Sequence, residues 1–134
     1  MQKVFAVVIN KENKLLLLKG SPNDPQYHKS FWYVVTGGKE DSDSTLQDTV
    51  IREVKEETNL NVNSVICLEK EFIYESLGEE CHEFVYACFV DDGEIILNEE
   101  SIDYKWCSRD EFLGLIEWYG DKKELVELLD KIFE

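Results

Sequence analysis

Positive charge is scarce in this chain. Its 134 residues include 14 lysines and arginines against 29 aspartates and glutamates, which gives a formal net charge of −15. Binding to a nucleic acid polymer or to an anionic membrane surface needs a positive face. The composition therefore predicts neither partner. A small anionic ligand stays compatible with it if cations mediate the contact.

Long apolar runs and closely paired cysteines are also missing. No stretch reaches the roughly 20 apolar residues of a transmembrane helix, and the apolar runs within residues 1–18 are too short and too charged for a signal peptide. The four cysteines contain no C-x-x-C spacing; they are Cys67, Cys81, Cys88 and Cys107. We therefore expect reduced thiols and a cytoplasmic protein.

The chain has only two prolines, and both lie in the polar stretch 20–30, GSPNDPQYHKS. This is the longest clear loop, and long loops in compact domains are often functional. Together with residues 75–82, it is the segment in which we expect ligand selectivity to lie. The length of the chain fits a single domain over residues 1–134.

Local patterns predict the order of strands and helices. Strands are expected at 3–9 and 15–19 (a hairpin), 31–36, 65–74, 82–90 and 104–107, and helices at about 45–58, after Ser108 and after Asp121. Ser108 and Glu111 have the spacing of a capping box. The order of strands, helix, strands and helices predicts an α/β layer fold with a mixed sheet covered by helices.

Residues 37–60, GGKEDSDSTLQDTVIREVKEETNL, carry the chemistry. Two glycines end a strand, an acidic loop follows, and the helix places Glu53, Glu56 and Glu57 within an arc of about 100°. Like charges this close repel one another unless a cation neutralises them. Carboxylate oxygens suit Mg²⁺ or Mn²⁺, which usually also bind substrate phosphates. The alternative is an ordinary solvated acidic face.

This segment resembles the box of the Nudix (MutT-type) hydrolases, G-x5-E-x7-R-E-U-x-E-E-x-G-U, where U is aliphatic. The matching positions are Gly38, Arg52, Glu53, Val54, Glu56, Glu57 and Leu60. The resemblance extends to the hairpin before the box, to the Trp-containing strand that leads into the glycines, and to Trp106 before Ser108. It therefore covers most of the chain and implies a Nudix-type α/β/α sandwich.

Two positions depart from the box. Asn59 replaces the second glycine, which is a mild change because Asn is the next best residue after Gly at a left-handed helix end. Ser44 replaces the first glutamate, which in the family lies near the arginine. Asp41 or Asp43 could take over that role. Ser44 is itself a good N-cap residue, with Gln47 completing a capping box.

The resemblance implies an Mg²⁺-dependent enzyme, with Mn²⁺ as the alternative ion, that cleaves the pyrophosphate linkage of a small nucleoside diphosphate derivative. Glu53, Glu56, Glu57 and the Gly38 carbonyl are the implied metal ligands. Arg52 is expected to orient the glutamates. The implied contacts to substrate come from Lys39, the two glycines Gly37 and Gly38, and Trp32.

Water attack also needs a general base, and members of the family place it differently. The candidates here are Glu99, Glu100 and Asp103, among which we choose Glu100 as the hypothesis, with Glu79, Glu80 and Glu83 as runners-up. Surface solvation is the simpler explanation for each of them. Stacking on a base is a second open role, for which the candidates are Tyr27, Phe31, Trp32, Phe72 and Tyr74.

The strand WYVVTGG is similar to that of members with a Trp-x-x-Val-Thr-Gly motif, which include dATP and dihydroneopterin triphosphate pyrophosphohydrolases. This favours nucleoside triphosphates weakly over ADP-ribose or dinucleoside polyphosphates. Ser44 keeps a second class open, a Nudix-fold module that binds a nucleotide with little or no cleavage. The sequence leaves open whether the protein forms a homodimer.

Overall fold

The computed structural model describes residues 1–21, 30–118 and 121–133, so most of the predicted loop at 20–30 lies outside it. In this part of the chain the elements are β1 (Gln2–Ile9), β2 (Leu15–Gly20), β3 (Trp32–Tyr33), β4 (Val35–Gly38), α1 (Leu46–Thr58), β5 (Val62–Ser76), β6 (Glu79–Val90), β7 (Ser101–Cys107), α2 (Arg109–Leu115) and α3 (Lys123–Ile132). None of the described helices is long and apolar enough to cross a membrane.

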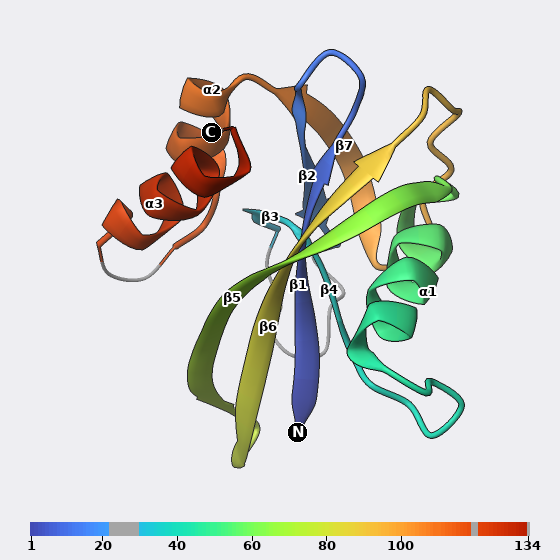
Figure 1. Ribbon diagram of the computed structural model, residues 1–134, viewed down its shortest axis with the longest axis vertical. Coiled ribbons are helices and arrows are strands. Elements are labelled where there is room, and N and C mark those ends of the chain that lie inside the picture. The colour runs from blue at the N-terminus through green and yellow to red at the C-terminus, as the bar shows by residue number, and fades with distance from the viewer. Residues whose placement is uncertain (22–29, 119–120, 134) are drawn as a thin grey trace.

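The strands form one mixed sheet. Strand β1 runs parallel to β6 and antiparallel to β4, and it meets β2 only at Ile9 and Leu15 before the two strands diverge. Strands β3 and β7 pair with β2, and β5 pairs with β6. Helix α1 covers one face of the sheet, whereas α2 and α3 lie on the other side (Figure 1). The predicted mixed sheet flanked by helices is confirmed.

Alternating side chains of β1 divide the core into two layers. Phe5 and Val7 belong to the cluster on the side of α2 and α3. Val4 and Val8 belong to the cluster that packs on Val50 and its neighbours in α1. A strand that is buried on both faces reads as a continuous apolar run, and β1 has this pattern.

Two predicted boundaries are wrong. The strand expected at 31–36 is interrupted at Val34, so it forms the separate strands β3 and β4. The segment 75–82 is not a loop, because β5 and β6 continue to a tight turn at Leu77–Gly78, where both residues have positive φ (53° and 79°). The capping box of Ser108 and Glu111 at the start of α2 is confirmed.

Candidate active site

Helix α1 is capped at both ends by residues with suitable side chains or backbone conformations. The Thr45 hydroxyl accepts a hydrogen bond from the Asp48 amide at 3.1 Å and caps the first turn. Asn59 ends the helix in the left-handed conformation, with φ of 70°. The predicted N-cap at Ser44 is wrong by one residue. Ser44 is exposed, whereas the side chain of the preceding residue, Asp43, is buried.

The strand end at Gly37 touches the middle of α1. A Cβ atom at residue 37 would lie 2.1 Å from the carboxyl carbon of Glu53. Any larger residue there would push the carboxylate away from the strand. The glycine is therefore needed for close approach, and it fixes Glu53 against the edge of the sheet.

Asp43 takes the place next to Arg52 that the box gives to a glutamate. Arg52 donates from Nε to Asp43 Oδ1 at 3.0 Å and from Nη2 to Oδ2 at 2.8 Å. The Thr49 hydroxyl and the Glu40 amide also donate to Asp43, each at 3.0 Å. These bonds, above all those from the guanidinium, hold the pKa of Asp43 well below its ordinary value.

The remaining donors of Arg52 reach the strand end and the helix. Nη2 donates to the Gly38 carbonyl at 3.0 Å, and Nη1 donates to Glu53 at 2.8 Å and to Glu56 at 3.2 Å. One guanidinium thus joins the loop, the strand and two glutamates of the box. Its partnership with Asp43 raises the pKa of Arg52, so it stays charged.

Glu57 is in the opposite situation. Only 6 % of it is exposed, and its Oε2 has no hydrogen-bond partner within the described part of the chain. Burial, a hydrogen bond with Glu53 and the negative charges of Glu100, Glu53 and Glu56 raise the pKa of Glu57 to about 10. Burial also raises the pKa of Glu53, although the Glu57 hydrogen bond and Arg52 oppose this.

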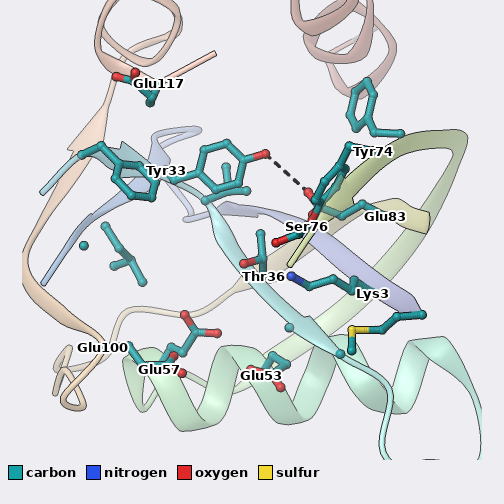
Figure 2. Close-up of a pocket in the computed structure, with 18 of the residues that line it drawn as sticks. Lys3, Tyr33, Thr36, Glu53, Glu57, Tyr74, Ser76, Glu83, Glu100 and Glu117 are labelled. Carbon is teal, nitrogen blue, oxygen red and sulfur yellow. Dashed lines mark hydrogen bonds between the residues drawn. The ribbon is translucent and has the colours of Figure 1, made fainter. Parts of the chain in front are cut away.

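A cavity of about 990 Å³ opens beside these carboxylates. Of the predicted site residues, it is lined by Gly37, Gly38, Lys39, Glu53, Glu57 and Glu100. Figure 2 shows Glu57 and Glu100 together near α1, with Tyr74 and Glu83 on the opposite side of the cavity. The site therefore joins the box to the turn before β7.

Three predicted residues do not line this cavity: Arg52, whose hydrogen bonds are described above, Glu56 and Trp32. Glu56 is half exposed and pairs with Arg52 on the outer side of α1. Trp32 lies outside the lining, packs against the core and has the Lys19 ammonium 6.0 Å above its ring. Its neighbours Phe31 and Tyr33 line the cavity instead.

Of the five alternatives to Glu100, four do not line the cavity: Glu99, Asp103, Glu79 and Glu80. All four are exposed, as Glu100 itself is. Glu83 is not solvated at the surface: only 2 % of it is exposed, and it lines the cavity. Sequence reasoning missed Lys3 and Trp118, which also line the cavity. For Lys3 the available signal was a cationic residue at the start of the apolar strand β1.

The carboxylates near α1 fit a divalent cation by their chemistry. Among residues 1–21, 30–118 and 121–133, no three His, Cys, Asp or Glu side chains already converge as a complete cage. Glu57, however, has a buried oxygen without a partner, and Glu53 lies beside it. Hard oxygen donors of this kind suit Mg²⁺ or Mn²⁺. A cation would compete with Arg52 for Glu53, Glu56 and the Gly38 carbonyl.

The chain belongs to the NUDIX domain family, whose model matches residues 1–129. It is 36 % identical over 62 residues to the uncharacterized Nudix hydrolase YvcI of Bacillus subtilis, and this match covers 46 % of the chain and 35 % of the relative. The chain thus matches about a third of the length of that curated relative.

Solved structures that share the fold include a MutT protein and a NUDIX domain. The MutT protein of Methanosarcina mazei has a TM-score of 0.80 at 24 % identity, over 100 % of this chain and 95 % of that one. The NUDIX domain of Shewanella oneidensis NrtR, solved with ADP ribose, has a TM-score of 0.77 at 20 % identity, over 100 % and 88 %. At these identities the likeness concerns the fold.

Proposed function

We propose that this protein is a divalent-cation-dependent pyrophosphohydrolase of a small nucleoside diphosphate derivative, with Mg²⁺ as the ion, Mn²⁺ as its substitute and nucleoside triphosphates as the favoured class. The observation that carries the proposal is Glu57. A buried carboxylate with an unpartnered oxygen and a raised pKa is costly to keep. It lies beside Glu53 and close to Glu100 at the end of the cavity near α1.

Each residue near α1 has a separate task in this proposal. Glu53, Glu57 and the Gly38 carbonyl hold the cation, and Glu56 contributes from the outer side of the helix. A bound dication lowers the pKa of the attacking water and offsets charge on the phosphates. Arg52 keeps Glu53 and Glu56 in place through hydrogen bonds to both.

Glu100 and Lys39 act on the substrate side. Glu100 lies in the turn before β7, and its negative charge contributes to the raised pKa of Glu57. In this position it can accept a proton from the water that attacks phosphorus. Lys39 follows the two glycines and lines the same cavity, so its ammonium can contact a phosphate oxygen.

The size and walls of the cavity support a nucleotide as substrate. About 990 Å³ is at the upper end of the volumes typical of small-molecule sites. The ADP ribose in the NrtR structure shows that a protein of this fold can bind a nucleoside diphosphate derivative. Aromatic side chains, among them Phe31, Tyr33 and Trp118, line the wall away from α1.

The test is a panel of nucleoside triphosphates, ADP-ribose and dinucleoside polyphosphates, assayed with Mg²⁺, Mn²⁺ or EDTA for release of phosphate and pyrophosphate. We expect metal-dependent turnover that is fastest for a triphosphate. Turnover in EDTA would reject the metal dependence. Binding of panel members without turnover would favour the alternative, a nucleotide-binding module, for which Ser44 in the box is the specific observation.

A further inference from the structure

Lys3 lies between the two ends of the cavity. It is paired across the sheet with Gly38 of β4 on one side and with Glu83 of β6 on the other, and all three residues line the cavity. Figure 2 shows Glu57 at the end near α1 and Tyr74 at the opposite end, with the Lys3 side chain extending into the space between them. Because neighbouring strands are about 4.8 Å apart, the backbone of Lys3 is one strand away from the glycines that lead to α1.

The charges around Lys3 are mostly negative. Among the described residues, eight glutamates and two lysines line the cavity, and the lysines are Lys3 and Lys39. The carboxylates repel an anionic ligand, so these two ammonium groups are the cations that the described walls of the cavity offer to a phosphate. Lys39 is exposed, whereas Lys3 is partly buried. An ammonium group acts more strongly on a phosphate where less water screens it.

The N–H donors of Lys3 are available to a ligand. An ammonium has three donors, and in the described part of the chain Lys3 makes no salt bridge; its nitrogen lies 6.0 Å from the centroid of the Tyr74 ring. Burial raises the pKa of Glu83, and a hydrogen bond from Tyr74 and the charge of Lys3 oppose the rise. The oxygens of Glu83, however, accept their hydrogen bonds from the hydroxyls of Tyr33 and Tyr74.

We propose that Lys3 is a positioning residue that binds the phosphate next to the nucleoside, and that this contact does not require the divalent cation. The inference rests on the proposed function, because it places the nucleoside at the aromatic end of the cavity and the scissile linkage near α1. It deepens that function by giving each part of the phosphate chain its own cation. Lys3 holds the phosphate on the nucleoside side, the metal ion neutralises the scissile linkage, and Lys39 contacts the terminal phosphate.

This division of roles follows from where the groups lie. The aromatic residues line the wall away from α1, and the carboxylates that fit a cation lie near α1. A nucleotide that spans the cavity therefore passes Lys3 with its first phosphate. Charge-assisted hydrogen bonds to phosphate are roughly twice as strong as neutral ones. Lys3 lies outside the box, so its contact is independent of the glutamates that would hold the metal ion.

The test compares the binding of a nucleoside monophosphate with that of its own nucleoside, by calorimetric titration in EDTA. The pairs are AMP and adenosine, GMP and guanosine, CMP and cytidine, and UMP and uridine. Taking the ratio of the two Kd values within a pair removes any preference for the base and leaves the contribution of the phosphate. For the pair that binds most tightly, we expect the monophosphate to bind about tenfold or more tightly than the nucleoside.

Lys3→Met keeps the length of the side chain and removes its charge. We expect the two Kd values of the same pair to fall within about twofold of each other in this variant, whereas Lys3→Arg should retain most of the wild-type ratio. Lys123→Met, an exposed change on α3 with the same loss of charge, is the matched control and should keep the ratio unchanged. Lys39→Met should also keep it, but should weaken the binding of inorganic pyrophosphate in the presence of Mg²⁺.

A merely structural role for Lys3, through its charge beside Glu83, would weaken the nucleoside and the monophosphate equally and leave their ratio unchanged. That result in folded Lys3→Met would overturn the inference. Whether or not the variant folds, the inference is also overturned if no monophosphate binds the wild-type protein in EDTA, or if every wild-type ratio is below about twofold.

Turnover assays separate this inference from the proposed function. A ratio that depends on Lys3 in a protein without turnover rejects the hydrolase and supports the phosphate contact. Turnover by a wild-type protein whose ratio is the same as that of Lys3→Met does the reverse. In an active enzyme, Lys3→Met should raise KM about tenfold with a smaller change in kcat, because a phosphate contact outside the scissile linkage stabilises bound substrate and transition state alike.

Discussion

Two buried carboxylates on either side of Arg52 have opposite surroundings. Asp43, in the loop before α1, receives hydrogen bonds from Arg52, Thr49 and the Glu40 amide, and its pKa is depressed. Glu57, one turn beyond Arg52, has an oxygen without a partner in the described structure, and its pKa is raised. Both oxygens of Asp43 therefore accept hydrogen bonds, whereas one oxygen of Glu57 accepts none within the described residues.

This difference in hydrogen bonding distinguishes a carboxylate that supports the structure from one that is available to a ligand. A buried charge that is fully hydrogen-bonded holds its surroundings in place, and its requirements are met within the chain. A buried carboxylate with an unused oxygen opposes folding unless something from outside binds it. Asp43 therefore belongs to the framework that positions the helix, whereas Glu57 belongs to the site that we propose binds a cation.

The largest effect is expected from Glu57→Gln. Loss of this carboxylate should lower kcat by roughly 10³-fold, because stabilisation of the transition-state charge depends on the cation it helps to hold. It should also weaken the rise in Tm that Mg²⁺ or Mn²⁺ gives the wild-type protein. Thermal unfolding with and without each ion, with Glu127→Gln as control, measures the second effect. A wild-type Tm unaffected by millimolar Mg²⁺ and Mn²⁺ would count against the site.

The next effect is expected from Glu100→Gln. If Glu100 accepts the proton from water, kcat should fall by roughly 10²-fold with little change in KM. Glu99→Gln, at the neighbouring residue that does not line the cavity, should be nearly silent. Partial rescue of Glu100→Gln by excess Mn²⁺ would instead assign Glu100 to cation binding. Equal kinetics for the two variants would remove Glu100 from the mechanism.

The buried carboxyl group of Glu57 should also make the stability of the protein depend on pH. The pKa of Glu57 is raised from 4.5 to about 10, so above pH 4.5 the folded protein keeps a proton that the unfolded chain loses. Stability in EDTA should therefore fall as pH rises from 5 toward 10, by at most about 1.4 kcal/mol per pH unit. Denaturant unfolding at several pH values measures this slope. Glu57→Gln should flatten it and be more stable than wild type at pH 8.

A smaller loss of activity is expected from Asp43→Asn. Asp43→Asn replaces the partner of Arg52 with an amide whose N–H groups face the guanidinium, so Glu53 and Glu56 lose their fixed support. Residues that orient the ligands of a metal typically contribute about 10- to 100-fold, and we expect kcat to fall by about tenfold. Asp41→Asn, on the exposed side of the same loop, is the control. Equal activity of the two variants would show that Arg52 does not need Asp43.

Much of this comparison was accessible from the sequence, because spacing alone determines which residues share a face of a helix. The arc of Glu53, Glu56 and Glu57 follows from 3.6 residues per turn, and the left-handed Asn59 follows from its place after the helix. The choice between Asp41 and Asp43 does not follow. It depends on how the loop backbone turns toward Arg52, and both residues are equally acidic and near in sequence.

Long-range pairing limited the remaining predictions. The strand expected at 31–36 is interrupted at Val34, because β3 pairs with β2 whereas β4 pairs with β1. This division changes which aromatic side chains line the cavity, and Trp32 is not among them. The burial of Glu83 was missed for a related reason. It depends on tyrosines of β3 and β5, and no local pattern in β6 shows that they converge on it.

The smallest effect is expected from Ser44→Glu, which restores the glutamate of the box. Arg52 has five N–H donors, and all are in use: Nε and Nη2 on Asp43, Nη2 also on Gly38, and Nη1 on Glu53 and Glu56. Ser44 is exposed, so a glutamate at this position would lie in solvent and would find no unused N–H donor of Arg52 to bind. We expect kcat within about twofold of wild type and a change in stability within about 0.5 kcal/mol. In Asp43→Asn the same substitution should restore part of the lost activity, because the new carboxylate then has donors of Arg52 to bind. A tenfold rise in kcat for Ser44→Glu alone would mean that Asp43 supports Arg52 poorly, and that the contrast between the two carboxylates is smaller than their hydrogen bonds indicate.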